Sequence, residues 1–300
     1  MHNRPRTNIA FTAFAFAFLA HLLSASAQTD LPGAVLFACP PCASNCDDEV
    51  YTEAGQCPVC NMQLVDKRRV DSGDLRPRTV GILIFDGVQI IDYTGPYEVF
   101  GQAGFKVFTV SEDGKTVTTA MGMSVNPTYS FTNCPNPDVL VIPGGSVQRV
   151  EDNPEVIDWV RKQSVRADHV QTVCNGAFIL AKTGLLNGRS ATTFYGLLDE
   201  LQTRYPEIDV VSDRRFVDNG KIVTSAGLSS GIDASLHVIS SIYGKGRAQQ
   251  IALHMEYDWR PESKFARAAL ADRHIRNVTS PTGYQWKLLS TEGDFDRWEI

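Results

Sequence analysis

The sequence predicts an α/β domain with a mainly parallel sheet and helices on both faces, preceded by a small cysteine-rich segment. Short runs of β-branched and apolar residues, such as 79–85 (TVGILIF), alternate with longer stretches of helical character. Strands that alternate with helices form parallel sheets whose strands are buried on both faces. Asp92, Gly144 and Cys174 each follow a predicted strand, and sites in such sheets lie at the carboxyl ends of the strands.

Four buried strands and one hairpin are predicted in this domain. The strands are 79–85, 105–110, 139–142 and 170–173, and the hairpin is 216–225 with Asn219-Gly220 as its turn. Helices are predicted from Thr94-Gly95-Pro96 onward and over 154–164, 175–183, 231–243 and 248–256. Cys174 therefore lies at a sharp turn from a strand into a helix.

The first residues have the features of a signal peptide. Arg4 and Arg6 precede an apolar run over 9–23, and small residues follow at 25–27. A membrane-spanning helix needs about 20 apolar residues, and this run is shorter and contains His21. We therefore expect an exported protein, periplasmic or secreted, without a membrane anchor.

The chain is expected to divide into five parts. They are a signal peptide (1–27), a cysteine segment (28–66), a linker (67–78), the main domain (79–260) and a C-terminal helix and hairpin packed on the main domain (261–300). The formal charge of -6 over 300 residues argues against nucleic acid as a partner, because phosphate binding requires a basic surface.

Five of the seven cysteines lie close together in the cysteine segment. They are Cys39, Cys42, Cys46, Cys57 and Cys60. Two C-x-x-C turns joined by a short loop can place four thiolates around one tetrahedral ion. The proline after Cys39 and Cys57 reduces the entropy that each turn loses when it binds an ion. A linker stapled by disulfides is the alternative, with one cysteine left over for Cys134; the spacing favours a metal.

The second half of this segment, CPVCNMQLV, resembles the short heavy-metal-binding domain found beside copper and other metal exporters. That family typically reads C-P-M-H and then C-P-x-C-G-M. Here Cys42 replaces the histidine and Asn61 replaces the glycine, whereas Met62 matches. A thioether suits a soft ion such as Cu(I). The expected ligands are thus the five cysteines and Met62, with zinc and copper both open, and no cofactor is expected for the main domain.

Three longer stretches resemble the ThiJ/PfpI superfamily, a class I glutamine amidotransferase-like group that includes isonitrile hydratase and the sensor domains of some transcription regulators. They are IFDGVQIIDYTGPYEVFG, VLVIPGG followed by TVCNGAFILAKTGLLNGRSATT, and TSAGLSSGIDASLHVI, in the expected order between residues 84 and 239. The resemblance implies a flavodoxin-like sandwich and a homodimer. Regulator members carry a DNA-binding domain after this region, which the short remainder at 261–300 does not accommodate.

The strand-to-helix turn predicts a reactive thiol at Cys174, because backbone N–H groups at a helix start stabilise a thiolate. The N–H groups of Gly145 and Asn175, next to Gly144, are expected to form an anion-binding hollow. By resemblance, Asp92 corresponds to the acidic residue that hydrogen-bonds the nucleophile in the hydratase branch. A carboxyl group pressed against a thiolate should have a raised pKa, which suits proton transfer near neutral pH.

Two residues depart from the family pattern. Phe194 stands where members usually carry the histidine of T-T-H-W, so a Cys–His pair is lost at this position. Asn175 stands where the hydratase has threonine. Hydratase chemistry depends on the aspartate and the cysteine, which are kept, and is therefore affected less than hydrolase chemistry.

Two functions are compatible with these features. The leading one is an exported cysteine-dependent hydratase or lyase that acts on a small electrophile such as an isonitrile or a carbonyl compound. The alternative is a non-catalytic metal- or redox-sensing protein in which the cysteine segment binds the metal and the main domain is a dimeric scaffold. Cys174 as an inert core thiol and Asp92 as a helix cap are the corresponding structural alternatives.

Overall fold

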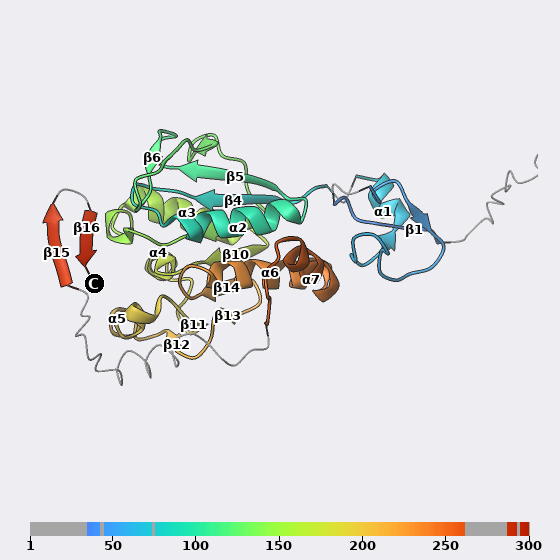
Figure 1. Ribbon diagram of the computed structural model, residues 1–300. Helices are drawn as coiled ribbons and strands as arrows, with labels where there is room; N and C mark the ends of the chain where they lie inside the picture. The colour runs from blue at the N-terminus through green and yellow to red at the C-terminus, as the bar shows by residue number, and fades with distance from the viewer. Residues whose placement is uncertain (1–34, 43–44, 74–75, 262–286, 293–294, 300) are drawn as a thin grey trace, which may run out of the picture. The chain divides into compact units, whose positions relative to one another are not determined.

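The computed structural model describes residues 35–42, 45–73 and 76–261, together with two strands near the C-terminus. Its main element is a seven-stranded sheet with the order β13-β14-β10-β9-β4-β5-β8 (Figure 1). The strands are β4 (Thr79–Leu83), β5 (Lys106–Ser111), β8 (Tyr129–Ser130), β9 (Val139–Ile142), β10 (His169–Thr172), β13 (Phe216–Asp218) and β14 (Ile222–Ser225). All neighbouring pairs are parallel except β13 and β14, so the predicted mainly parallel sheet is confirmed.

Helices cover both faces of this sheet, as predicted. They are α2 (Ile90–Gln102), α3 (Pro154–Arg166), α4 (Gly176–Lys182), α5 (Leu198–Arg204), α6 (Ser230–Tyr243) and α7 (Lys245–His254). Helix α2 packs against α6, and α3 packs against α4. The crossovers from β4 to β5 and from β9 to β10 run in opposite directions along the sheet. Right-handed connections therefore place α2 and α3 on opposite faces.

The sheet is the centre of the hydrophobic core. All four residues of β9 are buried, as are Val80 to Leu83 of β4, which confirms the prediction of strands enclosed on both faces. Short two-residue strands complete the domain: β6 (Val117–Thr118) pairs with β7 (Ser124–Val125), and β11 (Ser190–Ala191) pairs with β12 (Asp209–Val210).

Helix α2 begins earlier than the sequence predicts. The prediction placed its start at Thr94, whereas the helix runs from Ile90 with Pro96 in its interior. The hydroxyl of Thr94 donates to the Ile90 carbonyl over 2.8 Å within the first turn. Asp92 consequently lies inside the helix and does not cap it, and an acidic side chain in this turn is favoured by the helix dipole. The last helix also begins earlier than predicted, at Lys245 instead of Ala248.

The cysteine segment contains a small antiparallel sheet of its own. Its strands are β1 (Phe37–Ala38), β2 (Val50–Tyr51) and β3 (Val65–Asp66), in the order β2-β1-β3. Part of the predicted linker is helical, because α1 covers Lys67–Asp71. Asp66 caps this helix by accepting a hydrogen bond from the Arg68 N–H over 2.9 Å, a helix start that the prediction of a linker at 67–78 did not include.

The C-terminal hairpin is confirmed as an element. Strand β15 (Lys287–Glu292) pairs antiparallel with β16 (Phe295–Glu299). The predicted signal peptide at 1–27 and the predicted helix at 265–274 lie outside the described residues. Among the helices that the structure describes, none combines the length and the apolar character that crossing a membrane requires.

Candidate functional site

Cys174 occupies the turn between β10 and α4. Its backbone has φ +57°, in the left-handed region that residues other than glycine rarely adopt. Such a conformation costs on the order of 1–3 kcal/mol and persists where the surroundings enforce it. The Cys174 N–H donates to the Ala226 carbonyl over 3.0 Å, which ties the turn to the end of β14. The sharp turn predicted at this cysteine is therefore present, and the residue is buried, with 9% of its surface exposed.

Asp92 reaches the same place from the first turn of α2. Its side chain is fully buried. One carboxyl oxygen, Oδ2, accepts the Gly144 N–H over 3.1 Å, and Oδ1 accepts the Leu228 N–H over 3.1 Å. The carboxyl group also hydrogen-bonds the Cys174 thiol. The structure thus brings together the two residues that the sequence predicts as nucleophile and acid/base.

Burial controls the protonation of Asp92. Removal from water raises the pKa of its carboxyl to about 7, and the hydrogen bonds from Gly144, Leu228 and Cys174 only partly oppose this rise. The raised pKa expected from the sequence is present, and its largest cause is desolvation. A carboxyl group whose pKa lies near neutral pH is suited to proton transfer under ordinary conditions.

Gly144, Gly145 and Asn175 lie beside this pair. The Gly145 N–H donates to Asn175 Oδ1 over 2.8 Å, and Asn175 Nδ2 donates back to the Gly145 carbonyl over 2.8 Å. The Gly144 N–H is already bound to Asp92. Both glycine N–H groups therefore have acceptors within the protein. A substrate anion would have to replace Asn175 at Gly145, and the anion-binding role of these three residues stays a prediction.

Phe194, at the position of the family histidine, lies close to the thiol. A Cβ built on Gly227 would be 2.8 Å from Cδ2 of Phe194 and 3.5 Å from Sγ of Cys174. Because Gly227 has no side chain, the Phe194 ring and the Cys174 sulfur can both pack next to its backbone. The ring also packs against Tyr195, with 4.6 Å between centroids. An apolar wall therefore replaces the polar histidine of the family pattern.

Sequence reasoning missed three members of this site. Leu228 and Gly227 act through a backbone N–H and through the absence of a side chain, neither of which a residue-type pattern reveals. Thr193 donates its hydroxyl to the Cys174 carbonyl over 2.9 Å. Thr193 directly precedes Phe194, the residue at the position of the family histidine, and this place in the motif was the one signal available in the sequence.

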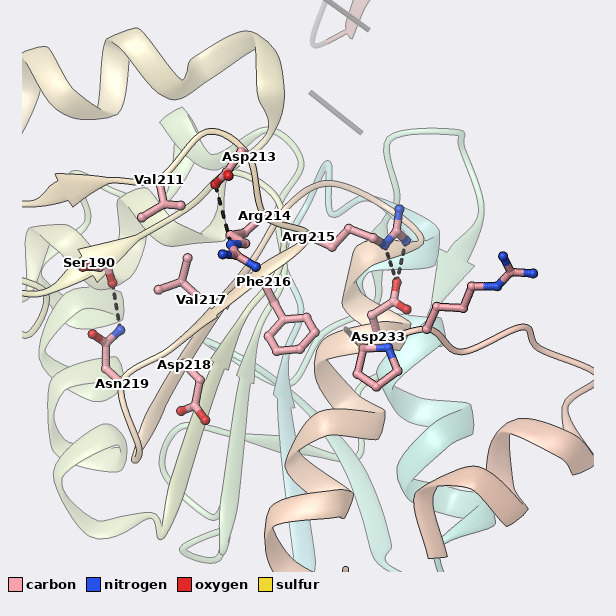
Figure 2. Close-up of a pocket in the computed structure, with 12 residues that line it drawn as sticks. Ser190, Val211, Asp213, Arg214, Arg215, Phe216, Val217, Asp218, Asn219 and Asp233 are labelled. Atoms are coloured by element: carbon pink, nitrogen blue, oxygen red, sulfur yellow. Dashed lines mark hydrogen bonds and ion pairs between the residues drawn. The ribbon is translucent and has the colours of Figure 1, made fainter. Parts of the chain in front are cut away.

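One hollow in the described part of the chain lies away from Cys174 and Asp92. It has a volume of about 520 Å³. Its lining includes Phe216, Ser190, Asp218, Asn219, Arg214 and Asp233 (Figure 2). Two ion pairs lie within its wall: Arg214 is 3.7 Å from Asp213, and Arg215 Nε donates to Asp233 over 2.7 Å. Two other charged residues of the lining pair with residues outside it, Asp218 with His237 and Arg260 with Asp258. Neither predicted catalytic residue lines it, so this hollow is not the site of Cys174 chemistry.

One wall of this hollow supports the loop that carries Leu228. Arg215 donates to the Ser229 hydroxyl over 3.1 Å, and Asp233 accepts the Tyr257 hydroxyl over 2.9 Å. Leu228 itself has φ +55°. These contacts hold its strained backbone so that its N–H reaches Asp92.

The five thiols of the cysteine segment are gathered in one buried cluster, which we call the thiol cluster. The ligand atoms fall into two groups, and within each group they lie within 4.8 Å of one another. One group consists of the sulfurs of Cys39, Cys46, Cys57 and Cys60, and the other of ligand atoms of Cys39, Cys42, Cys46 and Asp47. None of the seven cysteines, all of which are described, forms a disulfide. Met62 is fully buried in the same cluster; its role as a ligand stays a prediction.

The local backbone explains the substitution of glycine by Asn61. Asn61 has φ +58°, and asparagine tolerates this left-handed conformation better than most residues. Its N–H donates to the Cys57 carbonyl over 2.9 Å, and the Cys57 N–H donates to the Met62 carbonyl over 2.8 Å. The turn that holds the second C-x-x-C pair is therefore kept without the glycine.

Burial and hydrogen bonds between neighbouring groups shift the pKa values of the cysteines in the thiol cluster. Hydrogen bonds with Cys42 and Cys60, together with burial, raise the pKa of Cys39 far above its ordinary value. Burial also opposes ionisation of Cys57, but the Cys60 N–H and the Tyr51 hydroxyl outweigh it and lower the pKa of Cys57 to about 7. Several neighbouring thiolates require a compensating positive charge. Buried sulfur donors fit zinc or Cu(I).

Comparison with known proteins agrees with this division. The family model of the DJ-1/PfpI family matches residues 78–241, and that of the heavy metal binding domain matches residues 37–67. These ranges contain the Cys174 site and the thiol cluster, respectively.

The chain resembles proteins with different named activities. The chain is 35% identical to isonitrile hydratase from Pseudomonas putida over 182 residues, which cover 59% of this chain and 78% of that protein. It is 30% identical to an HTH-type transcriptional regulator from Pseudomonas aeruginosa, over 49% of this chain and 44% of the regulator. The crystal structure of a ThiJ/PfpI family protein from Pseudomonas syringae superposes with a TM-score of 0.58 at 28% identity, covering 68% of this chain and 86% of that one. Because the family match spans more than half of the sequence and includes the Cys174 turn, the chain belongs to the DJ-1/PfpI family.

Proposed function

We propose that this protein is a cysteine-dependent enzyme that hydrates a small electrophile, such as an isonitrile or a carbonyl compound. The observation that carries the proposal is the buried contact between the Asp92 carboxyl, with its pKa raised to about 7, and the Cys174 thiol. A nucleophile and a proton-transfer group in hydrogen-bond contact are what covalent catalysis requires. The similarity to isonitrile hydratase supports hydration as the reaction type.

The proposed sequence of steps conserves atoms and charge. The Cys174 sulfur forms a bond to the electrophilic carbon, and its proton passes through Asp92 to the substrate atom that gains the electron pair. Water then attacks the same carbon and gives one proton to Asp92. The carbon–sulfur bond breaks, and Asp92 passes this proton to the leaving sulfur of Cys174. The net change is the addition of one water molecule, and Cys174 and Asp92 return to their starting states.

In this scheme Gly144, Gly145 and Asn175 bind the substrate anion only after a side chain has moved. An oxyanion binds the Gly145 N–H only if it displaces the Asn175 side chain, because Oδ1 of Asn175 holds that N–H over 2.8 Å. Asn175 is then a residue that adjusts the hollow to the substrate. Phe194 limits the chemistry in another way, because it offers no proton acceptor where the family histidine would stand.

The test is turnover of a panel of isonitriles and carbonyl compounds by the wild type and by variants of the pair. Cys174→Ser is expected to abolish turnover, and Asp92→Asn to reduce it about 10²-fold or more, in the range that general acid–base catalysis contributes. Cys134→Ser is the matched control, since Cys134 lies away from both sites and donates to the Pro135 carbonyl. Full turnover by Cys174→Ser would sink the proposal.

A second function is favoured by a separate observation, the four buried thiols of Cys39, Cys46, Cys57 and Cys60, whose sulfurs lie within 4.8 Å of one another. We propose that the thiol cluster captures a soft metal, zinc or copper, with Met62 as a further candidate ligand. We also propose that the segment 1–27 directs export of the protein and that the protein forms a homodimer. On this basis the partners are a small molecule and a metal ion, and nucleic acid is not among them.

A further inference from the structure

The fifth cysteine of the thiol cluster is not needed for a single tetrahedral ion. Zinc in structural sites takes four ligands, and Cys39, Cys46, Cys57 and Cys60 already supply four sulfurs within 4.8 Å of one another. Cys42 is nevertheless buried in the cluster, with 3% of its surface exposed. Its Sγ lies 3.6 Å from Sγ of Cys46 and 3.9 Å from Sγ of Cys39.

Asp47 adds an oxygen donor next to this fifth sulfur. Oδ1 of Asp47 lies 3.1 Å from Sγ of Cys42, and it also accepts the Cys42 N–H over 3.1 Å. The backbone contact fixes the carboxylate beside the thiol. The ligand atoms of Cys39, Cys42, Cys46 and Asp47 consequently form a second group within 4.8 Å of one another.

The two groups share Cys39 and Cys46 and together contain six different ligands. A thiolate sulfur has more than one lone pair and can bridge two metal ions. With Cys39 and Cys46 as bridges, each of two ions has four ligands, which is the coordination number that zinc prefers. The six anionic ligands carry six negative charges and two divalent ions carry four positive ones, so the cluster is left with two negative charges, the same as for one zinc bound by four thiolates.

We propose that the thiol cluster is a binuclear site for two zinc-type divalent ions, bridged by Cys39 and Cys46 and closed by Cys42 and Asp47. The proposal rests on the metal-capture function above and specifies its stoichiometry and ligands. The separations agree with it: sulfurs bound to one tetrahedral zinc lie about 3.8 Å apart, and the distances from Cys42 are 3.6 and 3.9 Å. The Cys39–Cys60 pair, at 3.1 Å, has to open by roughly 0.7 Å to reach that value.

The test is the number of Zn²⁺ ions bound to the reduced full chain, measured by native mass spectrometry and elemental analysis. Wild type is expected to bind two. Cys42→Ser and Asp47→Asn are each expected to bind one, and far-UV circular dichroism verifies that the variants are folded. The carboxamide of Asp47→Asn keeps the size of the side chain, so this variant tests the ligand role even if Cys42→Ser fails to fold. Cys134→Ser is expected to keep two ions.

Substitution of Co²⁺ for Zn²⁺ provides an independent test of whether two ions lie next to each other. Two Co²⁺ ions joined by bridging thiolates couple magnetically, so the electron paramagnetic resonance signal per cobalt should be weaker in wild type than in Asp47→Asn with one Co²⁺. A single Zn²⁺ in wild type, unchanged in Asp47→Asn, would overturn the binuclear site and leave metal capture standing. No bound Zn²⁺ in wild type would overturn metal capture itself.

Discussion

The backbone N–H of Leu228 donates a hydrogen bond to Oδ1 of Asp92 over 3.1 Å and joins two residues that are 136 positions apart in the sequence. Gly144 binds the other carboxyl oxygen. The two N–H donors hold the carboxyl in one orientation, in contact with the Cys174 thiol. This arrangement explains why a group on the first turn of α2 can serve a nucleophile at the end of β10.

The first prediction concerns the pH dependence of Cys174 reactivity. Because the Asp92 carboxyl hydrogen-bonds the Cys174 thiol and has its pKa raised to about 7, its ionisation near pH 7 should provide the thiol with a proton acceptor. The alkylation rate of Cys174 by iodoacetamide should therefore rise through a midpoint near pH 7 in wild type. In Asp92→Asn this step near pH 7 should vanish, because the carboxyl that titrates there is gone.

The measurement requires that the five thiols of the cluster be replaced by serine, so that only Cys174 and Cys134 react. Cys134→Ser in the same background isolates Cys174. If Asp92→Asn keeps a step near pH 7, the pair is not the titrating unit, and the proton-transfer role proposed for Asp92 fails.

The second prediction concerns stability. Burial raises the pKa of Asp92 from the ordinary 3.8 to about 7 in the folded chain. The folded state therefore binds more protons than the unfolded state between these two values, and the free energy of unfolding should fall as the pH rises from about 4 to 7. At 1.36 kcal/mol per pH unit the loss is at most about 4 kcal/mol.

Urea unfolding of wild type and Asp92→Asn at pH 4, 5.5 and 7.5 provides the test. Asparagine does not titrate, so the difference between the two proteins should shift in favour of the variant as the pH rises. The slope with pH matters more than the absolute difference, since the amide group cannot accept both N–H donors. A difference that is constant over this range would contradict the buried, titrating carboxyl.

The third prediction uses two glycines in different surroundings. A Cβ on Gly144 would lie 2.2 Å from Oδ1 of Asn175 and 2.9 Å from Oδ2 of Asp92, whereas a Cβ on Gly101 would meet nothing within 4 Å. Gly144→Ala should destabilise the fold by about 1–3 kcal/mol and slow alkylation of Cys174. Gly101→Ala, in helix α2, should raise stability by about 0.5–1 kcal/mol. Equal stability of the two variants by thermal unfolding would show that Gly144 is not tightly enclosed.

Much of the fold could be predicted because its signals are local. The buried strands at 79–85 and 139–142 are continuous apolar runs, and the turn at Cys174 lies between a strand and a helix. The early start of α2 was missed, because Pro96 was interpreted as part of a helix start although the structure places it in the interior of the helix. The contact between Leu228 and Asp92 joins groups far apart in sequence, and its donor is a backbone N–H. The residue types at these positions therefore do not predict it.

The thiol cluster shows the same limit. The spacing of the two C-x-x-C pairs predicted a ligand set, and the sulfurs do converge. Asp47 was not predicted as a ligand, because an acidic residue in a loop is common and only the contact with Cys42 distinguishes it. The structure therefore adds the oxygen donor to a set that the sequence had defined by sulfur alone.

The last prediction concerns the apolar wall beside the nucleophile. Gly227→Ala would place a methyl group 2.8 Å from Cδ2 of Phe194 and 3.5 Å from Sγ of Cys174. The added methyl group must displace the ring, and it covers part of the sulfur. We expect alkylation of Cys174 to slow by about tenfold in this variant, and to become faster than wild type in Phe194→Ala, where the ring is removed.

The double variant, Gly227→Ala with Phe194→Ala, distinguishes a shared space from two separate effects. Without the ring, the new methyl group has room, so its effect on the alkylation rate should largely disappear. Residues in direct contact typically show a coupling energy of 0.5–3 kcal/mol in such a cycle, about two- to more than a hundredfold in rate. If the two substitutions act independently, Phe194 does not control access to the thiol, and its replacement of the family histidine has to be explained by the lost proton acceptor alone.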